Sequence, residues 1–313
     1  MAPLRINAPL HINTPLLKSE RLSSAGREVW LKLEALQPAG SFKNRGIGYA
    51  CQHYVSTGAS RLVSSSGGNA GIATAYCGHR LGVDVSVVVP DNAPLTAINA
   101  IKQFGASVII HGSSWQEAHN HALSLVDGSA KLIHPFDDPL LWPGHATLVD
   151  EVVEAGFRPD AVVISVGGGG LLCGITLGLE RNGLADVDVV AVETEGAASL
   201  NAAISAGAPV ELENITTIAN TLGAKQVSRA AFEATRAFNV TSHIVSDRDA
   251  LTSCQRFLDD HRILVEPACG ATLSAAYDMP AILLEKQRIL VVVCGGMGIS
   301  IKQLEQWDAS LES

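Results

Sequence analysis

Short runs rich in valine and isoleucine alternate with alanine-rich stretches along the first part of the chain. The strand-like runs are residues 29–34, 61–64, 84–89, 107–111 and 131–133, and the stretches with helical spacing are residues 42–55, 70–81, 95–104 and 115–126. Continuous apolar runs are typical of parallel strands that are buried on both faces. The alternation therefore predicts β-α units on a mostly parallel sheet.

A second series follows a turn-forming segment at residues 135–139. Strands are predicted at residues 161–166, 187–193 and 289–293, and helices at residues 140–155, 171–182 and in several segments between residues 193 and 289. We expect an α/β protein with two domains, each a mostly parallel, open twisted sheet with flanking helices. Because ligands of such sheets bind beyond the carboxyl ends of the strands, the loops there should carry the chemistry.

Composition and charge narrow the classes of partner. The chain has 313 residues, of which 47% are hydrophobic, and 22 Lys and Arg against 31 Asp and Glu give a net charge of −9. An acidic chain without a basic block is not expected to bind nucleic acid or an anionic membrane. The six cysteines are scattered, which favours reduced thiols. With no signal core and no apolar run near ~20 residues, a soluble, cytoplasmic protein is expected.

Lys43 is the first candidate for chemistry. Pro38 and Gly40 end the strand-like run before it, so Lys43 falls on the first turn of the helix-like stretch. The helix dipole there disfavours an ammonium group, and burial would add to this effect. A neutral amine can attack a carbonyl carbon and form a Schiff base. The alternative is an ordinary solvated lysine.

Three further loops follow predicted strands. Residues 64–71, Ser-Ser-Ser-Gly-Gly-Asn-Ala-Gly, open a helix whose free N–H groups could hold a carboxylate or a phosphate, with an amide donor from Asn69; the alternative is an ordinary N-cap turn. Cys294 lies in the loop after the last strand. It could be a small buried residue, or its thiol could face a ring nitrogen of a cofactor. His134 and His145 have no nucleophile motif beside them, so structural roles are expected.

The third of these loops contains four successive glycines at residues 167–170, which can turn several N–H groups toward one anion. It does not fit G-x-G-x-x-G or the P-loop pattern. Glu193, at the end of the next strand, could imitate the ribose-binding acid of a dinucleotide site. A lone phosphate fits the loop better.

Six segments together resemble the serine/threonine dehydratase family of fold-type II pyridoxal phosphate enzymes, and most of all the serine dehydratases with a cysteine at the pyridine nitrogen. The resemblance covers nearly the whole chain in the same order. The segments are Gly40-Ser-Phe-Lys-Asn-Arg-Gly46, Ser65-Ser-Gly-Gly-Asn-Ala-Gly71, Pro135-Phe-Asp-Asp-Pro139, Ser165-Val-Gly-Gly-Gly-Gly-Leu171, Leu264-Val-Glu-Pro-Ala-Cys-Gly270 and Val293-Cys-Gly-Gly296.

The resemblance implies a role for each matched residue. Lys43 would hold the cofactor covalently and, once released, take the α-proton of the substrate. The other cofactor contacts would come from Phe42 beside the ring, Asn69 near the 3-hydroxyl, Gly167, Gly168, Gly169, Gly170 and Leu171 at the phosphate, and Cys294 at the pyridine nitrogen. The substrate carboxylate would bind to the loop of Ser65, Ser66, Gly67, Asn69 and Ala70. A monovalent cation such as potassium would be held by Glu193 and by backbone carbonyls at Gly167, Ala197, Leu222 and Ala224.

The resemblance also implies an activity: β-elimination of water from L-serine or L-threonine, giving ammonia and pyruvate or 2-oxobutanoate. A large cofactor-binding domain would comprise residues 1–34 and 139–313. A small domain, which contains the substrate loop, would comprise residues 35–138. The protein would be a homodimer. No regulatory domain is expected after the catalytic region.

Several activities stay open beside this one. Gly67 lacks the hydroxyl that serine racemases place there, so racemisation is less favoured, and the room that it leaves admits a bulkier substrate such as phenylserine. The same residues are also compatible with a β-replacement synthase, and with a non-enzymatic phosphate or nucleotide sensor.

Overall fold

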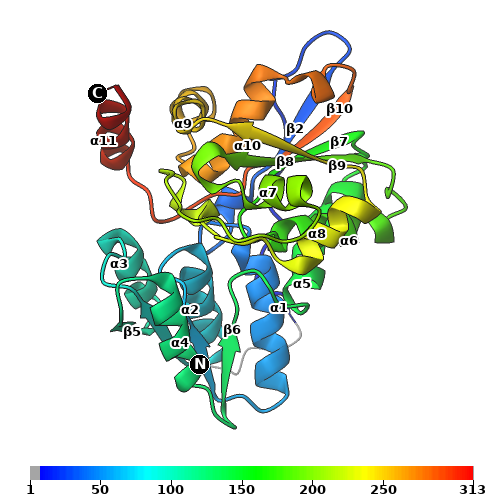
Figure 1. The fold of residues 1–313 in the computed structure, drawn as a ribbon. Helices are drawn as coiled ribbons and strands as arrows, with labels where there is room; N and C mark the ends of the chain where they lie inside the picture. The colour runs from blue at the N-terminus through cyan, green and yellow to red at the C-terminus, as the bar shows by residue number, and fades with distance from the viewer. Residues whose placement is uncertain (1–7, 313) are drawn as a thin grey trace.

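The computed structural model describes residues 8–312 as two lobes, each built around one sheet (Figure 1). The six-stranded sheet of the large lobe has the order β1-β2-β10-β7-β8-β9, and only β1 is antiparallel to its neighbour. Its strands are β1 (Leu16–Lys18), β2 (Glu28–Lys32), β7 (Ala161–Ser165), β8 (Asp188–Thr194), β9 (Val240–Val245) and β10 (Arg288–Val292). The α/β fold with mostly parallel sheets is confirmed.

The small lobe contains a four-stranded parallel sheet of order β5-β4-β3-β6. Its strands are β3 (Arg61–Ser64), β4 (Asp84–Val89), β5 (Ser107–Ile110) and β6 (Ala130–Ile133). Its helices are α1 (Lys43–Ser56), α2 (Asn69–Leu81), α3 (Leu95–Gln103) and α4 (Trp115–Ser124). The chain passes between the sheets after β2 and after β6, which supports domain boundaries at 34/35 and 138/139; the boundaries themselves stay a prediction.

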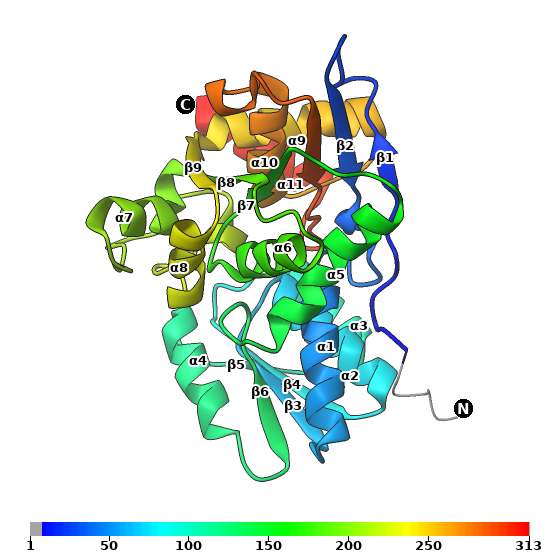
Figure 2. The same ribbon diagram turned by 90° about the vertical axis from the view of Figure 1, so that its right-hand side faces the viewer.

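Helices pack on both sides of the large sheet. α5 and α6 pair on one side, and α9 and α10 pair on the other (Figure 2). The helices of this lobe are α5 (Leu141–Glu154), α6 (Gly170–Arg181), α7 (Ser199–Ala206), α8 (Arg229–Ala237), α9 (Asp247–His261), α10 (Pro267–Asp278) and α11 (Ile301–Glu312). No helix within residues 8–312 combines the length and the apolar character that a membrane crossing requires.

Every strand and helix that was predicted with bounds begins and ends within two residues of them. Three elements were not predicted. β1 is only three residues long, and β9 is a half-exposed edge strand with Thr241, Ser242 and His243 at its centre, so neither has the continuous apolar run of a buried strand. α11 was also missed.

A buried ionic network ties α1 to the large lobe, where α1 and α5 lie side by side (Figures 1 and 2). The Arg45 guanidinium donates to Glu34 at 2.7 and 2.8 Å and to Glu151 of α5 at 2.7 and 2.6 Å. Lys32 of β2 donates to the same Glu151 at 2.6 Å and to the Thr14 carbonyl at 2.6 Å. Such bidentate pairs fix direction as well as distance, so they hold the start of α1 in place.

Candidate active site

Lys43 is the first residue of α1 and therefore lies on its first turn, as the sequence predicted. Its Nζ donates to the Pro135 carbonyl at 2.6 Å and lies 4.9 Å from the centre of the Phe42 ring. No carboxylate within residues 8–312 forms an ion pair with it. Burial lowers the pKa of Lys43 to about 8, although the nearby Cys294 and Glu266 act in the opposite direction. Roughly half of this amine is therefore neutral in mildly alkaline solution, and a useful share stays neutral at neutral pH.

The start of α1 is pinned to the turn that follows β10. The Phe42 N–H donates to the Cys294 carbonyl at 3.1 Å, and Ser41 forms an isolated antiparallel bridge with Gly295. The Phe42 ring packs against His145, with 5.0 Å between ring centres. The structure therefore brings together three residues from opposite ends of the chain: Phe42, Lys43 and Cys294.

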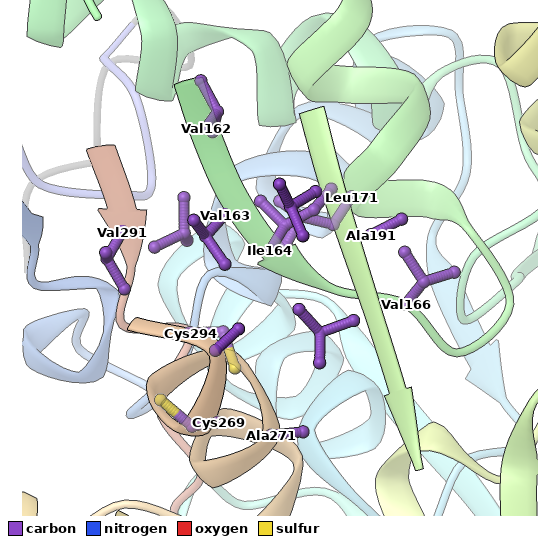
Figure 3. Packing of buried hydrophobic residues seen from close by; sticks show 14 of the residues in the cluster. Val162, Val163, Ile164, Val166, Leu171, Ala191, Cys269, Ala271, Val291 and Cys294 are labelled. Atoms are coloured by element: carbon purple, nitrogen blue, oxygen red, sulfur yellow. The ribbon is translucent and has the colours of Figure 1, made fainter. Parts of the chain in front are cut away.

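Cys294 is buried in this turn, with Cys269 of α10 beside it (Figure 3). Its Sγ lies 3.6 Å from the Ser165 hydroxyl at the end of β7. The hydrogen bond with Cys269, together with burial, raises the pKa of the Cys294 thiol well above its usual value. Cys294 is therefore a neutral thiol.

Asn69 reaches across from α2 to a buried carboxylate that the sequence analysis did not select. Its Nδ2 donates to Glu266 Oε1 at 2.8 Å, and its Oδ1 accepts from the Met297 N–H at 3.4 Å. Thr221 donates to the same Glu266 oxygen at 2.6 Å. Burial raises the pKa of Glu266 to about 7, although both donors act to lower it. A signal was available, since Glu266 stands inside the matched segment 264–270.

The other residues of the substrate loop have different surroundings. The Ser65 hydroxyl lies 2.9 Å from His119 Nδ1, and the Ser66 hydroxyl accepts from the Gly68 N–H at 3.3 Å. Ala70 lies in the core of the small lobe.

The surroundings of Gly67 bear on the alternative of a bulkier substrate. A Cβ at this position would lie 3.3 Å from side-chain atoms of both Val89 and Ala93. The space that this glycine leaves is therefore bounded by the protein itself, and it gives no support to the idea of extra room for a bulky substrate.

The glycine loop leads directly into α6, which begins at Gly170. Gly169 has a φ of +92°, a backbone conformation that other residues rarely adopt. Gly168 and Gly170 pack so closely against Phe136 that neither position has room for a Cβ. The Leu171 side chain lies in the core, so this residue can offer only its backbone to a ligand. The N–H groups of the first helical turn have no partner within the helix, which suits an anion.

The residues proposed to hold a cation are only partly brought together. The Glu193 carboxylate accepts from the N–H groups of Leu200 at 2.7 Å and Asn201 at 2.9 Å, at the start of α7. Burial raises the pKa of Glu193 to about 7. Gly167 and Leu222 lie backbone to backbone, and the Leu222 carbonyl already accepts from the Ala224 N–H at 2.7 Å. Ala197 is buried in the core. Within residues 8–312 no cluster of three or more His, Cys, Asp or Glu could hold a metal ion.

Both histidines near the Phe136 turn have structural contacts, as predicted. His134 Nδ1 accepts from the N–H groups of Phe136 and Asp137 at 3.3 and 2.8 Å, and burial lowers the pKa of His134 to about 4. His145 is fully buried between two helices, and its Nδ1 accepts from the Gly46 N–H at 3.2 Å.

Comparisons with known proteins agree with this arrangement. The model of the family "Pyridoxal-phosphate dependent enzyme" matches residues 8–295. The chain is 47% identical to a serine dehydratase-like protein of Mus musculus over 310 residues, covering 95% of this chain and 94% of the relative. It is 43% identical to the L-serine dehydratase/L-threonine deaminase of Homo sapiens, covering 95% and 94%.

The fold is also similar to a solved structure, a fungal L-serine ammonia-lyase from Rhizomucor miehei. The TM-score is 0.91 at 36% sequence identity, and the match covers 96% of this chain and 98% of the other. The chain therefore belongs to the family of pyridoxal-phosphate dependent enzymes.

Proposed function

We propose that this protein removes water from L-serine or L-threonine and releases ammonia with pyruvate or 2-oxobutanoate. The observation that carries the proposal is Lys43, an amine whose pKa lies near 8 and which has no carboxylate partner within the described chain. Relatives at 47% and 43% identity with dehydratase names support it.

The residues of the site fit pyridoxal phosphate. Lys43 would hold the aldehyde carbon, and Phe42 would pack beside the ring. The glycine loop, whose residues 168 and 170 tolerate no side chain, would offer its N–H groups and the start of α6 to the phosphate. Cys294 would place a neutral S–H at the pyridine nitrogen. When bound, the cofactor acidifies the α-C–H bond of the substrate amine attached to it.

The chain's own groups would do the rest. The Lys43 amine would take the α-proton, because burial keeps a share of it neutral at neutral pH. Ser65, Ser66 and Asn69 would orient the substrate carboxylate. A proton and the β-hydroxyl would leave as water, and the released enamine would take up water to give the 2-oxo acid and ammonia. Because Cys294 is neutral and buried, it would add no positive charge at the ring, which favours prompt loss of the hydroxyl.

Three further assignments belong to the same proposal. A potassium ion would bind between Glu193 and the carbonyls of Gly167, Ala197, Leu222 and Ala224, which requires the Glu193 carboxylate to be ionised. The protein would act as a homodimer, and it would work in the cytoplasm.

The test combines a spectrum with a product assay. The purified protein should absorb visible light, lose that band with borohydride, and carry the reduced adduct on the peptide that contains Lys43. L-serine should then give equal amounts of pyruvate and ammonia. A colourless protein that pyridoxal phosphate does not colour would instead favour a phosphate or nucleotide sensor. Diversion of turnover to a substituted alanine by added sulfide would favour a β-replacement synthase.

A further inference from the structure

A group of rings lies beside the substrate loop, and we call Trp115, His119, His134 and Phe136 the ring cluster. Trp115 stacks on His119 with 4.7 Å between ring centres and 20° between planes. His119 and His134 meet edge to face at 5.7 Å, and His134 meets Phe136 in the same way at 4.8 Å. Phe136 in turn packs on the glycine loop. The ring cluster therefore connects α4 of the small lobe to the glycine loop of the large lobe.

One member of the ring cluster contacts the substrate loop directly. His119 Nδ1 lies 2.9 Å from the hydroxyl of Ser65, which is fully buried. The hydroxyl has one proton to give. If Ser65 donates to His119, it has no proton left for a ligand. If His119 Nδ1–H donates to Ser65, the hydroxyl proton is free to point elsewhere.

Only the second arrangement lets Ser65 bind a carboxylate, because a carboxylate accepts hydrogen bonds and donates none. A chain of donors from Nδ1–H through the Ser65 O–H to a carboxylate oxygen is also cooperative, since each bond polarises the next. The Trp115 stack fixes the plane of the His119 ring, so Nδ1 stays directed at Ser65. Burial lowers the pKa of His119, so the ring is neutral near neutral pH and has a single N–H to place.

We propose that His119 is a positioning residue of the substrate site: its neutral ring carries the proton on Nδ1, donates to Ser65, and so turns the Ser65 hydroxyl toward the substrate carboxylate. This role rests on the function proposed above. His119 touches neither substrate nor cofactor, and it acts only through Ser65.

Two substitutions separate the hydrogen bond from the ring packing. His119→Phe keeps a ring on Trp115 and removes the donor. His119→Asn loses the ring, but its amide N–H can take the place of Nδ1–H. We expect His119→Phe to raise KM for L-serine about 10-fold with kcat within about threefold of wild type, because the Ser65 hydroxyl is no longer held toward the carboxylate and its hydrogen bond to this charged ligand is lost. His119→Asn should restore KM to within about threefold.

A double-mutant cycle and a matched control complete the kinetic test. Ser65→Ala should raise KM as much as His119→Phe, and the double variant should be no worse than either single variant. His121→Phe is the control, because His121 lies on the same helix and stacks on His111 at 4.1 Å, away from Ser65. It should leave both constants unchanged. Thermal midpoints of all variants separate a local effect from loss of folding.

A spectroscopic readout is independent of turnover. In protein labelled with ¹⁵N-histidine, the His119 ring should show a protonated Nδ1 and an unprotonated Nε2. An unprotonated Nδ1 would overturn the proposal, as would an unchanged KM in His119→Phe, a loss confined to kcat, or a failure of His119→Asn to restore KM. A wild-type protein that does not turn over L-serine would instead overturn the proposed function, while the ring tautomer would still be measured.

Discussion

The first turn of α1 separates two very different environments for charge. On one side Arg45, Lys32, Glu34 and Glu151 form a network in which every cation meets a carboxylate. On the other side, within residues 8–312, Lys43 donates to a carbonyl, lies over the Phe42 ring and forms no ion pair, and Glu266 accepts from neutral donors. Residues two apart on a helix point about 200° away from each other, so Lys43 and Arg45 can serve opposite sides of the same turn.

The pKa values of these groups show the effect of the two environments. Despite burial, Glu34 and Glu151 raise the pKa of Arg45 further, and Arg45 and Lys32 lower that of Glu151. Arg45 and Glu151 therefore stay charged near neutral pH. Without a direct ion pair, burial lowers the pKa of Lys43 to about 8 and raises the pKa of Glu266 to about 7. The ion pairs of Arg45 hold the start of the helix in place, whereas Lys43 and Glu266 can exchange a proton near neutral pH.

The largest effect is expected from Lys43→Ala. Loss of the amine should reduce turnover of L-serine about 10⁴-fold, because the proton acceptor is removed. The free energy of unfolding should change by less than about 1.5 kcal/mol, since one hydrogen bond to Pro135 is lost. Turnover and urea unfolding measure the two quantities, with Lys225→Ala at an exposed position as the control. Full turnover in Lys43→Ala would refute the role of this lysine.

Arg45→Met should mainly lower the stability of the fold, whereas Lys43→Ala mainly lowers turnover. Removing one partner of a buried ion pair leaves unpaired carboxylates and costs about 3–5 kcal/mol of unfolding free energy. The same substitution at Arg236, which is 59% exposed and lies 3.9 Å from Glu233, should cost less than about 1 kcal/mol. Equal midpoints in urea for the two variants would mean that the network does not brace the fold.

Glu266→Gln should change how stability depends on pH. Between the ordinary glutamate value of about 4.5 and the raised value of about 7, folded wild type keeps a proton that the unfolded chain has lost. Its stability therefore falls as pH rises through this window, and glutamine avoids the loss. We expect unfolding free energies to shift in favour of Glu266→Gln by roughly 3 kcal/mol from pH 4.5 to 7. A difference that stays constant with pH would contradict an unpaired carboxylate.

Thr221→Val should give the smallest effect, with the opposite sign. The Thr221 hydroxyl donates to Glu266 and helps to keep its pKa down. Its removal should cost about 1 kcal/mol above pH ~7, because the pKa of Glu266 rises further and the pH-dependent loss of stability continues to a higher pH than in wild type. Unfolding curves at several pH values test this, and an unchanged midpoint at every pH would show that water replaces the hydroxyl.

Most of the sheets and the position of Lys43 were predictable, because local patterns encode them. Buried parallel strands appear as continuous valine and isoleucine runs, and Lys43 stands at a visible helix start. The contacts between side chains that are far apart in the sequence were not predictable in the same way. Asn69 and Glu266 are 197 residues apart, and Arg45 and Glu151 are 106 apart. Only the fold brings such pairs together, and no periodicity marks them.

All six cysteines are buried: Cys51, Cys77, Cys173, Cys254, Cys269 and Cys294. A thiol-specific alkylating reagent can reach them only when the surrounding structure opens. Two of them report on the small lobe and four on the large one, so alkylation followed by mass spectrometry would time the opening of each lobe in the unaltered chain. The six native thiols thus serve as built-in probes of local opening.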